Sequence, residues 1–302
     1  ITKGCLSAGA DFGRALRLGL NLQIADFSPT KDQVRVNRDC VMFNCWSTRL
    51  RLSSFTIGVG LFCLLQSGAA MSDDSLGLPG LVNVSCENTN YSPVVLVHGT
   101  FANARRAYST VAPILKEDGF CLYALNYGRQ GGYGVNGTAD IQASLSEVTE
   151  FIDKVLQNTG AKKVSVIGHS QGGLLAFLAS NTPELADRID RIIAVAPSLR
   201  GTNLIPPRIS SVHCPACVQL GSGSDFMKDL QHRKLNPGGL RALVIATKDD
   251  LVVTPVESQF LDEPGVTNIY LQDRFPNLRA SHSGLLHVPQ AVALIKDFLI
   301  RE

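Results

Sequence analysis

From residue 93 onward, short continuous apolar runs alternate with stretches whose apolar residues recur every three or four positions. The runs predict strands at 93–98, 121–126, 164–167, 192–195, 242–246 and 266–271. The three- and four-residue spacing predicts helices at 138–156, 172–180 and 288–300. Strands that alternate with helices are typical of a parallel sheet, and uninterrupted apolar runs indicate burial on both faces. We therefore expect an α/β fold, with a mostly parallel central sheet and helices on both faces.

The segment 198–239 departs from this alternation. It is rich in Pro, Gly, Ser and polar residues, which predicts a long loop inserted into the fold. Such a loop can act as a lid or clamp over a substrate, or it can be an ordered surface loop. The sequence leaves both interpretations open.

The first seventy residues have a pattern of their own. Met42 is the first methionine, Arg49 and Arg51 follow it, and the apolar stretch Phe55–Leu65 leads into small residues at 67–70. This order is typical of a secretory signal peptide, and the stretch is shorter than the roughly 18–20 residues of a transmembrane helix. A short membrane anchor or a buried helix is the alternative. The predicted parts are an extension of no assigned function (1–41), a signal peptide (42–70) and a folded domain (71–302).

Charged residues are sparse along the whole chain, and the small basic excess lies near the N-terminus. The chain has 28 Lys and Arg against 26 Asp and Glu, a net charge of +2, and the basic excess lies within residues 1–70. The remainder is close to neutral, which argues against nucleic acid as a partner because nucleic-acid binding needs a basic face. Apolar residues make up 45% of the chain, enough for a large core and too many for a disordered chain.

Four of the eight cysteines follow the predicted signal peptide, namely Cys86, Cys121, Cys214 and Cys217. An even set in an exported chain predicts disulfides, and four cysteines allow three connectivities. The Cys214-Pro-Ala-Cys217 segment could close a local bridge, which would leave Cys86 to pair with Cys121. A thioredoxin-like redox pair is the alternative for Cys-x-x-Cys. A metal site is not expected, because no second ligand pair completes one.

Three N-glycosylation sequons begin at Asn83, Asn90 and Asn136. Sequons also arise by chance, and their use depends on the host. Together with the signal peptide they favour a secreted glycoprotein.

The segment Gly168-His169-Ser170-Gln171-Gly172 matches the motif G-x-S-x-G between a predicted strand and a predicted helix. In that context the motif holds a serine in a sharp turn so that its hydroxyl stands free above the sheet. The glycines leave room for the turn, and the helix N-terminus favours negative charge. The motif therefore predicts a nucleophilic Ser170; the alternative is a glycine-rich turn with an inert serine.

A serine nucleophile needs a base, and in this motif class an acid and then a histidine follow the serine along the chain. Asp249 and Asp250 directly follow the strand predicted at 242–246, and their positions do not separate them. Among the six histidines, order and spacing favour His282 over His287.

An oxyanion hole needs two backbone N–H groups. One is expected from Gln171, the residue after the nucleophile. The other is expected from Thr100, in the loop after the strand predicted at 93–98, and its hydroxyl could add a further hydrogen bond.

On these motifs the chain resembles the class 2 lipases, which are secreted α/β-hydrolases. The resemblance spans about residues 84–300 and rests on PVVLVHGTF (93–101), CLYALNYG (121–128), GHSQGG (168–173), the stretch from CPAC to GSDF (214–226), DDLVVTP (249–255) and HSGLL (282–286). It implies an α/β-hydrolase fold, Asp250 as the acid, His282 as the base and a disulfide between Cys86 and Cys121. Two features depart from the family pattern. Asp249 stands where an aromatic residue is common, and the segment 272–282 lacks a cysteine that often precedes the histidine.

The expected activity is hydrolysis of carboxylic esters, above all acylglycerols, through an acyl-enzyme on a Ser170–His282–Asp250 triad, with no cofactor. Expected partners are a lipid or small ester substrate and a transient lipid interface; the oligomeric state is open. An acyltransferase or a non-lipid carboxylesterase on the same triad is the alternative, as is a catalytically silent secreted binding protein. Apolar residues beside the triad could line an acyl-binding wall or belong to the core: Phe101, Leu251, Val252, Val253, Leu285 and Leu286.

Overall fold

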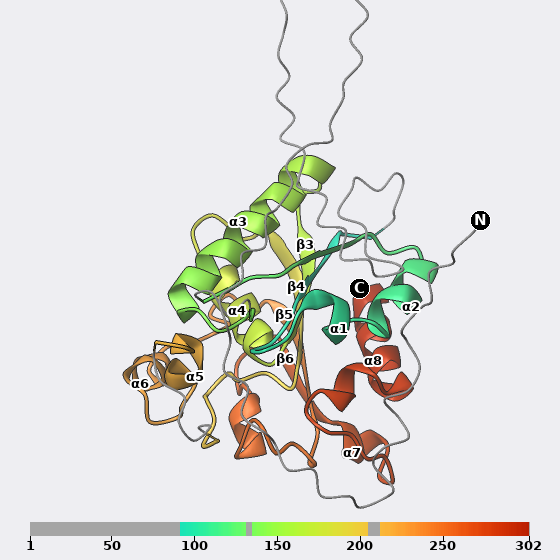
Figure 1. Ribbon diagram of the computed structural model, residues 1–302. Helices are drawn as coiled ribbons and strands as arrows, with labels where there is room; N and C mark the ends of the chain where they lie inside the picture. The colour runs from blue at the N-terminus through green and yellow to red at the C-terminus, as the bar shows by residue number, and fades with distance from the viewer. Residues whose placement is uncertain (1–90, 131–134, 205–211, 302) are drawn as a thin grey trace, which may run out of the picture. The chain divides into compact units, whose positions relative to one another are not determined.

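The computed structural model describes residues 91–130, 135–204 and 212–301 (Figure 1). They all belong to one of two compact units into which the chain divides, residues 66–302. The predicted extension and signal peptide, Cys86 and the sequons at Asn83 and Asn90 lie outside the described residues and stay predictions. No helix of the described ranges is long and apolar enough to cross a membrane.

Six parallel strands form one sheet in the order β2-β1-β3-β4-β5-β6. Their bounds are β1 (Val94–Val97), β2 (Leu122–Leu125), β3 (Val164–His169), β4 (Ile189–Val195), β5 (Arg241–Ala246) and β6 (Val266–Tyr270). All six predicted strands are present, and the predicted α/β fold with a parallel sheet is confirmed. The chain runs from β1 to one edge at β2 and then crosses back to β3. In open parallel sheets a ligand crevice forms beyond the carboxyl ends of the strands at such a reversal.

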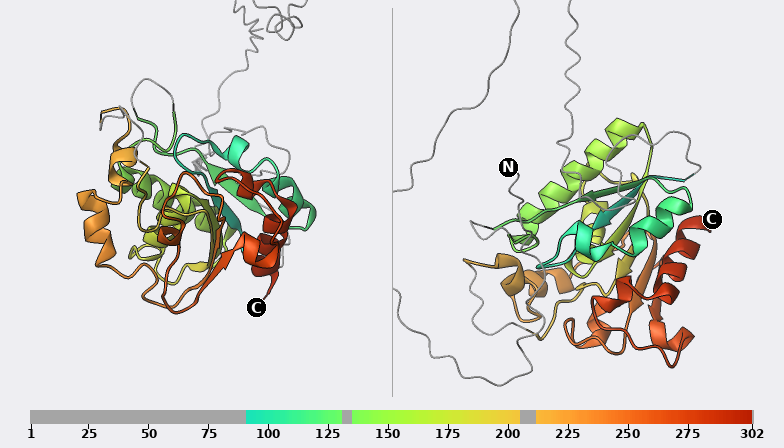
Figure 2. Two further views of the ribbon diagram at one scale, coloured as in Figure 1. Left: turned by 90° about the horizontal axis from the view of Figure 1, so that it is seen from below. Right: turned by 45° about the vertical axis from the view of Figure 1, so that its right-hand side comes forward.

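Helices cover both faces of the sheet (Figure 2). On one face α3 (Ile141–Thr159) and α4 (Gln171–Ser180) share a core with alternate β1 residues, among them Val95. On the other face α2 (Val111–Glu117) and α8 (Pro289–Ile300) share a core with the remaining β1 residues, among them Leu96. Burial on both sides explains why the strands read as continuous apolar runs.

Helix α3 begins three residues later than its apolar spacing predicts. Asp140 provides the N-cap: its Oδ1 accepts hydrogen bonds from the N–H groups of Gln142 at 2.8 Å and Ala143 at 3.1 Å. The helix ends at Thr159 and is capped by Gly160, whose φ of 69° is readily adopted only by glycine. The cap, rather than the apolar spacing, fixes where the helix starts.

The segment 198–239 contains more regular structure than its composition predicts. Two short helices, α5 (Pro215–Gln219) and α6 (Asp225–Gln231), occupy part of it. Buried residues of α6, Met227 and Leu230, join the core on the α3 side of the sheet. Helix α6 is therefore packed against the core. Further short helices, also absent from the sequence expectations, are α1 (Ala104–Ala107), α7 (Leu271–Arg274), η3 (Val256–Gln259) and η4 (Gly284–Leu286).

Candidate active site

Ser170 lies in a strained turn between β3 and α4. Its φ of 55° and ψ of −122° are unusual for a residue with a side chain and cost about 1–3 kcal/mol. Glycines surround the turn because a side chain would collide with backbone: a Cβ on Gly172 would meet the carbonyl oxygen of Val97, and one on Gly168 would meet the carbonyl of Gly172. The turn predicted from G-x-S-x-G is present at the carboxyl end of β3.

His282 and Asp250 come together at the carboxyl edge of the sheet. The Nδ1 of His282 lies 2.7 Å from Oδ2 of Asp250, and both side chains are almost entirely buried. The other carboxylate oxygen, Oδ1, accepts the backbone N–H groups of Val252 at 2.8 Å and Val253 at 3.0 Å. Burial raises the pKa of Asp250, but the hydrogen bonds from His282 and from these N–H groups outweigh it and hold the pKa below its usual value. The site therefore keeps a charged carboxylate behind the imidazole.

A second histidine holds the backbone of His282. His169 Nε2 lies 3.1 Å from the carbonyl oxygen of His282, and the two ring centroids are 4.8 Å apart. Since a carbonyl can only accept, His169 carries its proton on Nε2. Burial, helped by the nearby His282, lowers the pKa of His169 to about 3, so this ring stays neutral near pH 7.

Ser170, His282 and Thr100 line one cavity of about 560 Å³. Within the described residues, no hydrogen bond joins the Ser170 hydroxyl to the His282 ring. In enzymes without bound substrate such bonds are often long, and they tighten in the substrate complex. The geometry therefore brings the predicted nucleophile and base to one cavity, with the acid behind the base.

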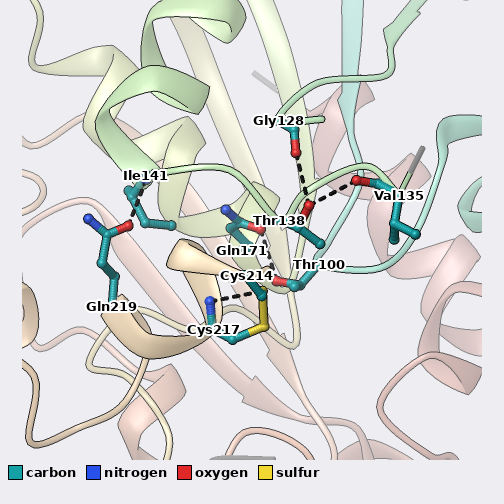
Figure 3. Close-up of a disulfide and its surroundings, with 9 residues drawn as sticks. All are labelled: Thr100, Gly128, Val135, Thr138, Ile141, Gln171, Cys214, Cys217 and Gln219. Carbon is teal, nitrogen blue, oxygen red and sulfur yellow. Dashed lines mark hydrogen bonds between the residues drawn. A yellow bond between two sulfur atoms is a disulfide. The ribbon is translucent and has the colours of Figure 1, made fainter. Parts of the chain in front are cut away.

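The two residues expected at the oxyanion hole are joined through their side chains. Thr100 Oγ1 donates a hydrogen bond to Gln171 Oε1 at 2.9 Å (Figure 3). In the part of the chain that the structure describes, neither backbone N–H donates a hydrogen bond. The Thr100 hydroxyl, which we expected could add a further hydrogen bond at the oxyanion hole, thus bonds to the Gln171 side chain. Both N–H groups remain available beside Ser170.

The six apolar residues expected near the triad differ in their positions. Phe101, Val252, Val253 and Leu286 line the cavity. Leu285 is buried in the core beneath α8. Leu251 is 81% exposed and does not line the cavity, although Val252, the next residue, does. Of the six residues expected in an acyl-binding wall, four therefore line the cavity, one belongs to the core and one lies on the surface.

The local bridge predicted from Cys-x-x-Cys is present. Cys214 and Cys217 form a disulfide at the start of α5, and Cys217 lines the cavity (Figure 3). Cys121 is also disulfide-bonded. Its expected partner, Cys86, lies outside the described residues, so that pairing stays a prediction. Asn136 of the third sequon is half-buried.

The alternative base, His287, and the alternative acid, Asp249, make other contacts. His287 also lines the cavity, but its Nδ1 lies 2.8 Å from the Thr110 hydroxyl, and no carboxylate of the described residues is hydrogen-bonded to its ring. The carboxylate of Asp249 accepts the backbone N–H of Ala280 and pairs with Arg279. The two adjacent aspartates thus point to different partners.

Sequence reasoning missed two contributors to the site. Gln259 Nε2 donates to Oδ2 of Asp250 at 2.9 Å. It lies in η3, and no motif or spacing marks it. His169 stood inside the recognised motif, but its contact with His282 crosses 113 residues of sequence, so local patterns give no signal of it.

Residues 91–287 match the family described as Lipase (class 2). The triacylglycerol lipase of Burkholderia plantarii is 29% identical over 219 residues, which are 70% of this chain and 52% of that protein. The triacylglycerol lipase of Pseudarthrobacter phenanthrenivorans is 32% identical over 173 residues, 55% of this chain and 45% of that protein. The chain therefore spans about half the length of these curated relatives.

Solved structures with the same fold include lipases. Aspergillus fumigatus lipase B has a TM-score of 0.62 and 23% identity, covering 74% of this chain and 56% of that one. The mature form of the Bacillus licheniformis lipase BlEst2 has a TM-score of 0.53 and 13% identity, covering 72% and 96%. At these identities the likeness is one of fold, and it is the α/β-hydrolase fold.

Proposed function

Because the chain belongs to the class 2 lipase family, we propose that it is a secreted serine hydrolase that cleaves carboxylic esters, above all acylglycerols. The observation that carries the proposal is the buried 2.7 Å hydrogen bond between His282 and Asp250, made at a cavity that Ser170 also lines. A carboxylate behind an imidazole that faces a serine is the arrangement that turns an alcohol into a nucleophile.

The reaction proceeds in two acyl-transfer steps. His282 Nε2 takes the proton of the Ser170 hydroxyl as Oγ attacks the ester carbonyl, and then gives that proton to the departing alcohol. Water, deprotonated by the same ring, releases the acid from the acyl-enzyme. Asp250 keeps the proton of His282 on Nδ1 and stabilises the imidazolium that forms in each step.

Negative charge develops on the carbonyl oxygen during both steps. The backbone N–H groups of Thr100 and Gln171 are the proposed donors to it, and both lack another acceptor among the described residues. The bond between their side chains holds the β1 loop against the start of α4. Fixed donors of this kind stabilise the transition state because they need no reorganisation as the charge appears.

The cavity and its surroundings favour an apolar acyl group. Val253 and Leu286 lie in its wall, and the exposed side chains of Phe101, Leu204 and Val252 also line it. Leu251, beside them, is the most exposed of the large apolar side chains of the described residues. Such apolar side chains at the mouth of a cavity fit contact with a lipid surface.

Secretion is proposed from the signal-peptide pattern at 42–70, and the Cys214–Cys217 bridge fits an oxidising compartment. Sequencing of the N-terminus of the exported protein tests this proposal. A mature chain that starts near residue 71 supports it, and one that retains Met42 contradicts it.

The catalytic proposal is tested with Ser170→Ala on a soluble p-nitrophenyl ester and on an emulsified triacylglycerol. We expect kcat to fall by at least about 10⁴-fold on both, since loss of the nucleophile alone inactivates such triads. Ser283→Ala, which alters another serine of the same cavity, is the matched control and should stay active. Turnover that survives in Ser170→Ala would contradict the proposal. Acyl transfer to added alcohol in preference to water would favour the acyltransferase.

A further inference from the structure

Ala280 lies two residues before His282. Its carbonyl oxygen and its N–H are both hydrogen-bonded to side chains of the turn that follows β5. The buried Thr247 hydroxyl donates to the Ala280 carbonyl oxygen at 2.8 Å. Asp249 Oδ2 accepts the Ala280 N–H at 3.3 Å. Ala280 is itself buried, so neither group can turn to solvent instead.

Gln272 ties the two holding side chains together. Its Nε2 lies 2.8 Å from Thr247 Oγ1, 3.3 Å from Asp249 Oδ2 and 3.4 Å from the carbonyl oxygen of Leu278. Its Oε1 accepts the backbone N–H of Lys248 at 3.0 Å. We call Thr247, Asp249 and Gln272 the Ala280 clamp.

The acid of the proposed triad belongs to the same turn as the Ala280 clamp. The backbone N–H of Asp250 donates to the carbonyl oxygen of Thr247 at 3.2 Å. One turn after β5 therefore directs the Asp250 carboxylate to His282 Nδ1 and also fixes the backbone that carries the His282 ring.

We propose that the Ala280 clamp is a positioning device that sets the His282 ring against Asp250 and toward Ser170. The inference rests on the proposed function, since it assigns positioning residues to that reaction. It also gives a role to Asp249, whose carboxylate faces Ala280 rather than the His282 ring.

Several features favour positioning over a role in surface charge. The Asp249–Arg279 ion pair is 3.0 Å long, but Arg279 is 85% exposed, and exposed pairs contribute little. Two of the clamp side chains instead bond both backbone groups of Ala280, its carbonyl oxygen and its N–H. Misplacement of a reacting group by about 1 Å can cost about a hundredfold in rate.

Kinetics of three variants on a soluble p-nitrophenyl ester test the proposal. Asp249→Ala removes the acceptor for the Ala280 N–H, and we expect kcat to fall about tenfold or more with KM within about twofold. Asp249→Asn removes the charge but keeps an acceptor oxygen, and it should retain most of kcat. Asp273→Ala is the matched control, because it breaks the exposed pair with Lys248 on the same segment without touching Ala280. Equal kcat in Asp249→Ala and wild type, or equal losses in Asp249→Ala and Asp273→Ala, would overturn the proposal.

A spectroscopic measurement separates the clamp from the proposed activity. The proton that His282 Nδ1 shares with Asp250 should give a far-downfield ¹H NMR signal. Thr247→Val, which removes the clamp hydroxyl, should weaken or shift this signal, and Thr247→Ser should keep it. An unchanged signal in Thr247→Val would overturn the clamp even in a fully active enzyme. A different combination is a wild type that hydrolyses no ester while Thr247→Val still loses the signal. That combination would refute the proposed function but leave the clamp supported.

Discussion

Asp250 accepts a 2.7 Å hydrogen bond from His282 through a carboxylate that also receives Gln259 and two backbone N–H groups. These bonds leave the carboxylate one orientation, and in it Oδ2 faces His282 Nδ1. The acid is therefore fixed before any substrate arrives. The ring it orients opens on the cavity that holds Ser170.

Asp250→Asn should lower kcat by about 10³–10⁴-fold with little change in KM. The amide can donate to His282 Nδ1, which favours the ring tautomer that cannot accept the serine proton. Steady-state kinetics on a soluble ester give the measurement. Asp249→Asn, the adjacent matched change, should cost far less; similar losses in both variants would contradict the assignment of Asp250.

Gly172→Ala should lower the free energy of unfolding by about 3 kcal/mol. The added Cβ would collide with the carbonyl oxygen of Val97 in β1, and backbone on both sides cannot yield cheaply. Urea denaturation measures the loss. Gly223→Ala, where a Cβ meets open space, is the control and should stay within about 0.5 kcal/mol of wild type. An unchanged free energy of unfolding in Gly172→Ala would contradict the tight packing of this glycine against β1.

Local patterns could predict the strands of the sheet and the turn that holds Ser170, because both depend on residues close in sequence. Continuous apolar runs marked the strands, and the glycines around Ser170 marked the turn. Helices α5 and α6 were missed because five and seven residues are too few to show a helical period. The partners of Asp250 could not be predicted, since Gln259 reaches it only through the fold of the intervening turn.

The same limit explains the ambiguity between the adjacent aspartates. Residues 249 and 250 have the same chemistry and the same place after β5, so spacing cannot assign their roles. The family resemblance pointed to Asp250. The fold separates the two side chains by direction: one faces His282 and the other faces Ala280.

Stability should fall steeply as pH drops below about 6.5, because two histidines are buried in neutral form. Burial lowers the pKa of His98 to about 4 and that of His169 to about 3. In the unfolded chain both histidines bind a proton once the pH falls below their ordinary pKa of about 6.5. In the folded chain they bind it only at about pH 3–4, so between these values the unfolded chain holds two more protons. Each such proton steepens the fall in unfolding free energy by about 1.4 kcal/mol per pH unit.

Urea denaturation between pH 6.5 and pH 4 checks this in His169→Asn, whose slope should be smaller than the wild-type slope by about 1.4 kcal/mol per pH unit. His232→Asn replaces an exposed histidine and should leave the slope unchanged. Parallel slopes for wild type and His169→Asn would show that His169 is not the source of the acid sensitivity.

Leu251→Gln should weaken adsorption to lipid emulsions about tenfold while sparing turnover of a soluble short-chain ester. Its side chain is 81% exposed beside the cavity, and burial of a leucine side chain in a lipid surface contributes about 1.5–3 kcal/mol. Partitioning onto a triacylglycerol emulsion, measured by sedimentation, reports the change. Ile300→Gln, an exposed apolar position at the C-terminal end of α8, is the control. Equal adsorption of the two variants would exclude Leu251 from the lipid contact.

Covalent labelling with a p-nitrophenyl alkylphosphonate tests most directly whether Ser170 is the nucleophile activated by His282 and Asp250. We expect one phosphonate per chain, found by mass spectrometry on the peptide that contains Ser170, with slow labelling in Asp250→Asn and none in Ser170→Ala. Labelling of another residue, or stoichiometric labelling of Ser170→Ala, would contradict this assignment.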